Sequence, residues 1–254
     1  MEGSKKVKRN RIKIGILSVL AAIGCFILIA YARTWGKTEL EFKIHINDQL
    51  VLQSVFGESP TFAIWIENTE TRENKTIFVT KRAGTEDWEG KVNVPSALPR
   101  WGEINEIEQQ TGKAHEDIDA VSGATPQPGY FITRARMKPG SRWICWIEMN
   151  LAGDYNENYP EYDEEKKTSD EYGTGQPALV YKAYVEAQKG NVVIPEVIGM
   201  SIVDETGGEI IRPLEGITTA LDVFDEIVIS VVKPKPKVLE KPDFLKNILA
   251  NLNP

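Results

Sequence analysis

The sequence predicts a mostly β protein, a two-sheet antiparallel β-sandwich that is immunoglobulin-like, with one N-terminal transmembrane helix and a short C-terminal helix. From Glu39 onward, apolar and polar residues alternate with the period of two that is typical of a half-buried strand. Eight further short runs of β-branched and aromatic residues follow, with turn residues between them. Helical patterns are confined to two short stretches of this central part. This combination favours a sandwich over a parallel α/β fold.

The N-terminal segment predicts a membrane anchor. Residues 1–13 carry six Lys or Arg and one Glu, and residues 14–32 form an apolar run without charge. That length suits the hydrocarbon core of a bilayer, and the basic flank predicts a cytoplasmic N-terminus with the body on the extracytosolic side. An alternative stays open: Ala30-Tyr31-Ala32 has the small-x-small form of a signal-peptidase site, so cleavage after Ala32 would release the body.

The body is expected to span residues 36–232, after an anchor region at 1–35. Leu40, Phe42, Ile44 and Ile46 define the buried face of the first strand, and Asn47-Asp48 predicts a turn after it. The other expected strands cover residues 62–66, 76–80, 130–136, 142–148, 178–185, 192–194, 197–203 and 227–232. The expected helices cover residues 103–110 and 218–224.

The tail, residues 233–254, has a different composition. Its first five residues alternate Lys and Pro, which predicts an extended spacer and not a central strand. Residues 243–252 then place five large apolar side chains on one helical face, which predicts a short amphipathic helix: Phe244, Leu245, Ile248, Leu249 and Leu252.

Charge and cysteine content exclude several functions. Residues 14–254 have a formal charge of −12, which is unsuited to nucleic-acid binding. Cys25 lies in the apolar run, so Cys145 is the only cysteine of the body and no disulfide can form within it. There is no Cys-x-x-Cys-His haem motif, no phosphate-binding glycine loop, and no serine or cysteine within a recognisable nucleophile motif. If this protein transfers electrons, an organic cofactor such as flavin must carry them.

One stretch, Asp119-Ala-Val-Ser-Gly-Ala-Thr125, asks for a chemical explanation. Ser122, Gly123 and Ala124 have minimal side chains, so the hydroxyl of Thr125 would be easy to approach. Pro126 favours an extended backbone at Thr125, and the carboxylate of Asp119 could accept a proton. A structural alternative also stays open, in which the stretch is a small-residue turn capped by Asp119.

This stretch resembles the flavinylation signature of bacterial membrane-associated flavoproteins, the FMN-binding domains of Na-translocating quinone reductases and related complexes. In that family a dedicated flavin transferase uses FAD to attach FMN through a phosphodiester to the last hydroxyl residue. The resemblance implies that Thr125 is the acceptor. It implies that Asp119, Ser122, Gly123 and Ala124 form the recognition frame.

A longer resemblance covers about residues 40–232. Several segments occur in the order typical of an uncharacterised periplasmic family, domain of unknown function 2271: residues 63–67, 97–101, 119–129, 148–150, 154–156 and 175–181. Its members are associated with flavin transferases and membrane-bound redox proteins. The resemblance therefore implies the same kinds of partner for this chain.

A calcium loop is a further hypothesis. Asp154, Asn156 and Asn158 alternate as calcium ligands do, and Glu165 stands at the twelfth position. However, Tyr159 occupies the position that needs glycine, so residues 154–172 are also interpretable as an exposed acidic loop rich in tyrosine. The two histidines, His45 on the polar face of the first strand and His115 near the motif, are expected at the surface.

Two functions are consistent with these patterns. The first is a membrane-anchored extracytosolic electron carrier with covalent FMN on Thr125, which would be a flavin-transferase substrate and not a stand-alone enzyme. The second is a cofactor-free cell-envelope β-sandwich that binds proteins or assists assembly.

The alternation in residues 143–146 places both faces of that strand in a core, so most tryptophans are expected to pack and not to stack on a flavin.

Overall fold

The computed structural model describes residues 18–29, 31–32, 34, 36–85, 97–110, 122–123, 126–202 and 208–234. Residues Thr38–Val232 form one compact unit, and the N- and C-terminal segments belong to a second. Within the predicted anchor, residues 18–29 are helical. None of the helices in the described part is both long and apolar enough to cross a membrane. Residues 14–17 and 30 of the predicted span, and the predicted tail helix, lie outside the described residues.

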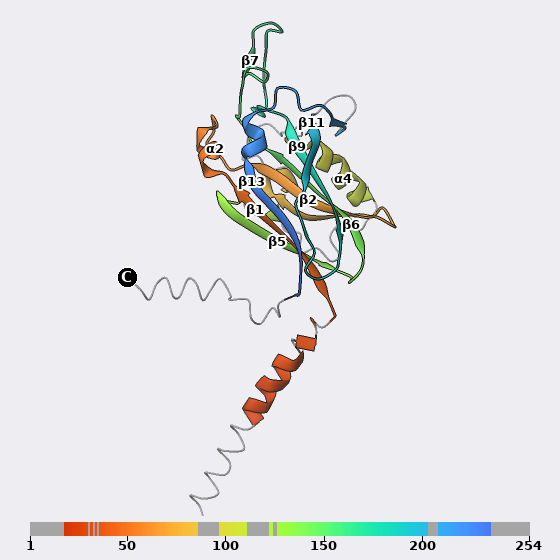
Figure 1. Cartoon of the computed structure of the whole chain (residues 1–254). Helices are drawn as coiled ribbons and strands as arrows, with labels where there is room; N and C mark the ends of the chain where they lie inside the picture. Colours follow the sequence, from red (N-terminus) through yellow and green to blue (C-terminus); the bar gives the residue numbers. More distant parts are fainter. Residues whose placement is uncertain are drawn as a thin grey trace, which may run out of the picture. The chain divides into compact units, whose positions relative to one another are not determined.

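The compact unit contains two large sheets (Figure 1). The four-stranded sheet has the order β10 (Val192–Val193), β13 (Phe224–Val232), β1 (Thr38–Ile46), β5 (Gly129–Met137). The seven-stranded sheet has the order β12 (Ile210–Ile211), β11 (Glu196–Ser201), β9 (Ala178–Glu186), β6 (Arg142–Asn150), β2 (Thr61–Asn68), β3 (Asn74–Thr80), β4 (Ser122–Gly123). β3 and β4 pair in parallel, whereas the other pairs are antiparallel. The predicted mostly β, two-sheet architecture is thereby confirmed. A small hairpin of β7 (Tyr162–Asp163) and β8 (Thr168–Ser169) is separate from both sheets.

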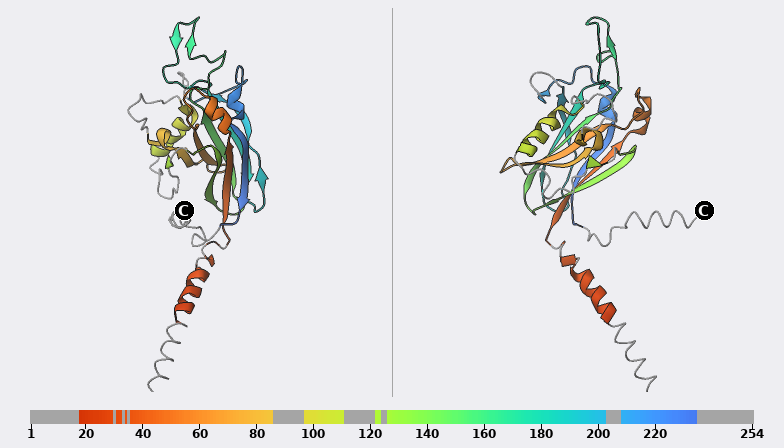
Figure 2. Two further views of the ribbon diagram at one scale, coloured as in Figure 1. Left: turned by 90° about the vertical axis from the view of Figure 1, so that its left-hand side faces the viewer. Right: turned by 180° about the vertical axis from the view of Figure 1, so that it is seen from behind.

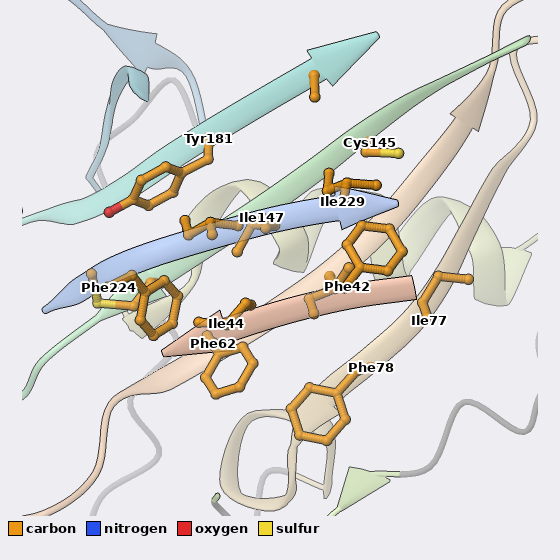
Figure 3. Close-up of a cluster of buried hydrophobic side chains, with 14 of the residues drawn as sticks. Phe42, Ile44, Phe62, Ile77, Phe78, Cys145, Ile147, Tyr181, Phe224 and Ile229 are labelled. Carbon is orange, nitrogen blue, oxygen red and sulfur yellow. The ribbon is translucent and has the colours of Figure 1, made fainter. Parts of the chain in front are cut away.

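The main core lies between the two sheets. The alternation predicted for the first strand is confirmed, because Leu40, Phe42, Ile44 and Ile46 of β1 are fully buried. They pack with side chains from the inner face of the seven-stranded sheet, such as Phe62 of β2, and Figure 3 shows this cluster. Burial of these apolar side chains on both inner faces is the main force that holds the sheets together.

The seven-stranded sheet is apolar on its other face as well. A second cluster joins that face to α4 (Pro99–Gln110), and Figure 2 shows the helix beside the sheet. Trp65 of β2 and Trp146 of β6 stack there with ring centroids 5.9 Å apart. On β6, Cys145 belongs to the inner core and Trp146 to this second cluster. The predicted burial of both faces of residues 143–146 is therefore confirmed, and helix α4 provides the second cover.

Two short helices differ from the sequence expectation. Asn47-Asp48 does not form a simple turn but begins α2 (Asp48–Gln53), because Oδ1 of Asn47 accepts hydrogen bonds from the backbone N–H groups of Gln49 and Leu50, at 3.1 and 3.4 Å. α3 (Lys81–Thr85) follows β3 directly. Elements of six and five residues are too short to show a helical period in the sequence. The helix expected at 218–224 is a 3-10 turn, η2 (Thr219–Asp222), that leads into β13.

Candidate functional site

The small-residue motif lies at an edge of the seven-stranded sheet. Ser122 and Gly123 form β4, which pairs in parallel with Val79 and Thr80 at the end of β3. β4 is the outermost strand of this sheet on that side. Edge strands leave one row of backbone groups without a partner strand. The remaining motif residues lie outside the described residues: Asp119, Ala124 and Thr125.

The chain after the motif connects the two sheets. β4 belongs to the seven-stranded sheet, whereas β5 is the outermost strand of the four-stranded sheet. Gly129, at the start of β5, has a φ of +110°, a region that favours glycine. Of the residues before it, Pro126 and Pro128 are partly exposed and Gln127 is exposed. In the sequence, Thr125 therefore falls in a five-residue connection between two edge strands.

A polar cluster on the outer face of the four-stranded sheet surrounds Tyr130, the second residue of β5. The hydroxyl of Tyr130 donates to Oε2 of Glu226 at 3.0 Å, and Nζ of Lys43 donates to Oε1 of the same carboxylate at 2.8 Å. Nζ of Lys43 also lies 4.2 Å from the centroid of the Tyr130 ring. The ring of His45 lies 4.5 Å from that of Tyr130, and its Nδ1 is 2.6 Å from Oδ1 of Asp225. The expected place of His45 on the polar face is confirmed.

Lys43 and Glu226 of this cluster shift each other's pKa. The hydrogen bond to Glu226 raises the pKa of Lys43 above its ordinary value, and the hydrogen bond from Lys43 lowers the pKa of Glu226. Both groups therefore stay charged over the physiological pH range. The cluster fixes Tyr130 by a charge-assisted hydrogen bond at one end and a cation against its ring.

The residues of the predicted calcium loop take part in hydrogen bonds within the sandwich. Asp154 accepts the hydroxyl of Thr219 on Oδ1 at 2.6 Å and Nε2 of Gln176 on Oδ2 at 2.7 Å. Burial raises the pKa of Asp154, against the lowering effect of the Thr219 hydrogen bond. Gln176 is almost fully buried, and its Oε1 accepts the backbone N–H of Thr218 at 2.7 Å. Asp154 therefore helps to hold the loop before β9 against η2.

The other three residues of that loop make their hydrogen bonds in two separate turns. Oδ1 of Asn156 accepts the backbone N–H groups of Asn158 and Tyr159, each at 2.9 Å. Glu165 lies in the turn between β7 and β8, where its backbone N–H donates to Oδ1 of Asp163 at 2.9 Å. Throughout the described ranges, no three His, Cys, Asp or Glu side chains lie close enough together to hold a metal ion.

We expect calcium to have little effect on the melting temperature, because the carboxylate oxygens of Asp154 and the side-chain Oδ1 of Asn156 already accept hydrogen bonds. The melting temperature in EDTA and in millimolar Ca²⁺ should agree within about 1 °C, since a ligand that does not bind the folded state cannot stabilise it. Mg²⁺ provides the control for ionic strength. A rise of several degrees with Ca²⁺ alone would show that these side chains rearrange around the ion.

Glu148, for which the sequence pattern predicts no role, lies at the centre of a buried polar site. Its carboxylate is fully buried on β6 and faces the first turn of α4. Oε2 accepts the backbone N–H of Trp101 at 2.6 Å, and Oε1 accepts the backbone N–H of Arg100 at 3.0 Å. The hydroxyl of Ser201 also donates to Oε1. The signal in the sequence is a single acidic residue among the apolar residues 143–149.

Burial dominates the chemistry of Glu148. It raises the pKa of this carboxyl to about 7, although the hydrogen bonds from Ser201, Trp101 and Arg100 oppose the shift. A second carboxylate fixes the far end of the helix, because Glu108 accepts the backbone N–H and the hydroxyl of Thr76 at 2.9 Å each. Two buried carboxylates therefore attach α4 to the sheet, and we assign them a structural role.

The described tryptophans do not provide an exposed surface for a flavin. Trp65, Trp101 and Trp146 are buried in the cluster under α4, and Trp143 is partly buried beside the main core. Trp88 lies outside the described residues, as does His115. The expectation that most tryptophans pack in a core holds for these four.

These features define a mostly β protein with two large antiparallel sheets and a small-residue motif at a sheet edge. Comparison with known proteins adds no family to this description. No protein-family model matches the chain, and neither a curated protein nor a solved structure matches it.

Proposed function

We propose that this chain is a membrane-anchored, extracytosolic electron carrier with FMN attached to Thr125. The observation that supports the proposal most directly is the position of β4. The motif residues Ser122 and Gly123 form an outermost strand, and the connection that follows them is partly exposed at residues 126–128. A transferase can reach a hydroxyl in such a connection more easily than one beneath packed strands.

The attachment is a transfer of FMN from FAD. The hydroxyl oxygen of Thr125 forms a bond to the phosphorus of the FMN half of FAD, the pyrophosphate P–O bond breaks, AMP leaves and the hydroxyl proton passes to a base. Asp119 is the motif carboxylate that would orient or deprotonate the hydroxyl, and the small Ser122, Gly123 and Ala124 leave room for the transferase. The bound flavin would then accept electrons from a membrane-bound redox protein and pass them to a terminal acceptor.

Residues 14–32 would hold the carrier at the membrane, with the body outside the cytoplasm, as the basic N-terminal segment favours. Covalent attachment has a physical advantage in that location, because a flavin that dissociated there would be diluted and lost. An immunoglobulin-like strand arrangement stays a prediction beside the observed two-sheet architecture.

Replacement of Thr125 tests the proposal. Co-expression of the full chain with a flavin transferase should give a yellow protein whose fluorescence survives denaturing electrophoresis and whose mass exceeds that of the bare chain by one FMN. Thr125→Ala should abolish both signals, since no acceptor oxygen remains. Thr133→Ala, a threonine on β5, is the control and should keep the flavin. A colourless wild-type chain of unmodified mass, produced with an active transferase, would contradict the proposal.

An exposed apolar surface supports the second candidate, a cofactor-free protein-binding or assembly module. Leu52, Val55 and Phe56, on α2 and the turn after it, are all largely exposed. The backbone of this surface is attached to a neighbouring loop, because the backbone N–H of Val55 donates to the carbonyl of Gly153 at 3.1 Å. A Cβ atom at Gly153 or Gly173 would lie within 2.9 Å of the Phe56 ring, so both loops pack closely under it. Exposed apolar patches of this kind often bind proteins.

A further inference from the structure

Two large apolar side chains are exposed at successive outward positions of β5. Tyr130 is 59% exposed and Ile132 is 51% exposed. In the register of the sheet, they stand opposite His45 and Lys43 of β1 on the same outer face. β5 is the outermost strand, so this pair lies at the border of the sheet. Neither side chain takes part in the core between the sheets.

The tyrosine of this pair is held in a fixed orientation although it is exposed. Its hydroxyl is bound to Glu226 at 3.0 Å, and Lys43 and His45 contact its ring from β1. An exposed aromatic ring that is already fixed loses little conformational entropy when a planar ligand stacks on it. The geometry is therefore that of a prepared stacking surface.

The position of the pair in the sequence identifies the ligand that can reach it. Thr125 precedes Tyr130 by five residues, so the two Cα atoms are at most about 18 Å apart. Phe131, the next residue along β5, offers less exposed aromatic surface. Its ring turns inward against Phe62 and Phe78, with ring centroids 5.2 and 4.5 Å away. On this part of β5, the exposed aromatic surface is that of Tyr130.

We propose that Tyr130 and Ile132 form the binding surface for the isoalloxazine ring of the FMN attached to Thr125. This inference rests on the proposed function. The ring of Tyr130 stacks on the flavin, and Ile132 covers the part of the flavin that extends along the strand. The covalent bond keeps the ring close by, so that a weak stacking interaction is enough to hold it in one position.

Flavin fluorescence in the transferase-modified full chain tests the surface, because a stacked tyrosine quenches the emission of a flavin. In Tyr130→Leu, emission per bound flavin should rise about two- to tenfold and its polarisation should fall, as expected when one aromatic pair is lost. Tyr184→Leu is a matched control. Tyr184 is also an exposed strand tyrosine with a lysine over its ring, Lys182 at 5.1 Å, but it lies on β9 of the other sheet. The flavin emission of Tyr184→Leu should equal that of the wild type.

The outcomes separate the two proposals. Equal flavin content in all three proteins with unchanged emission in Tyr130→Leu would overturn the binding surface and leave the carrier function intact. A wild-type chain without flavin would overturn both. If Tyr130→Leu alone fails to acquire flavin, Tyr130→Phe decides, because a stacking role requires that this variant regain both the flavin and the high polarisation of its emission. Its ring can stack on the flavin although, without a phenol, it does not quench.

Discussion

Replacement of Glu148 by alanine should lower the free energy of unfolding by about 3 to 5 kcal/mol, a large share of the stability of a typical domain. The substitution removes the acceptor for the backbone N–H groups of Arg100 and Trp101 and for the hydroxyl of Ser201. Trp101 and Ser201 are buried, so their donors lose a hydrogen bond without gaining water, and the N–H of Arg100 is partly buried in the first turn of α4. The cavity left by the side chain adds to the loss. Urea unfolding of the full chain measures the effect.

The same residue should make stability depend on pH. Burial raises the pKa of Glu148 from about 4.5 in the unfolded chain to about 7 in the fold. Between these values the folded state holds a proton that the unfolded state has lost, so the free energy of unfolding falls as pH rises from about 4.5 to 7. The stabilisation is complete below pH 4.5 and absent above pH 7, and it amounts to about 3 kcal/mol.

Glutamine at position 148 separates the proton from the hydrogen bonds. Glu148→Gln keeps the shape of the side chain but does not titrate, so the decline in stability between pH 4.5 and 7 should shrink in this variant. Its amide can serve only some of the three donors, so it should still lose about 1 to 2 kcal/mol at pH 5. Glu186→Gln, at an exposed glutamate of β9, should behave like the wild type. Equal pH profiles in wild type and Glu148→Gln would contradict the assignment.

The sequence predicted the sheets better than it predicted their connections. The eight longer strands follow from runs of β-branched and aromatic residues, and β1 shows why: its alternation is that of a strand with one buried face. α2 was mistaken for a turn because Asn47 caps a helix as readily as it forms a turn. The small strands β4, β7, β8 and β12 have two residues each and carry no detectable period.

The candidate site could be predicted only in part. The order of small residues in the motif identifies Ser122 and Gly123, but their place at a sheet edge comes from the pairing of β4 with β3, a contact about 40 residues apart in the chain. The cluster around Tyr130 joins β1, β5 and β13, so that no local pattern reveals it. Glu148 was missed for the same reason, since its three donors come from α4 and β11.

Truncation of Phe62 should be as damaging as loss of Glu148, because this fully buried ring joins the two sheets. It belongs to β2 and contacts Phe78 of its own sheet and Phe131 and Phe224 of the other, with ring centroids 5.0, 5.2 and 5.3 Å away. Phe62→Ala should cost about 3 to 5 kcal/mol in urea unfolding, the usual cost of truncating a core phenylalanine. Phe62→Leu should lower the free energy of unfolding less, by about 1 to 1.5 kcal/mol, since leucine refills most of the volume. Tyr184→Ala, at an exposed position, is the control and should stay within about 0.5 kcal/mol of the wild type. A loss below 1 kcal/mol in Phe62→Ala would mean that the sheets do not pack through this ring. The inward orientation of Phe131 would then be wrong as well, and the choice of Tyr130 as the exposed aromatic surface depends on that orientation.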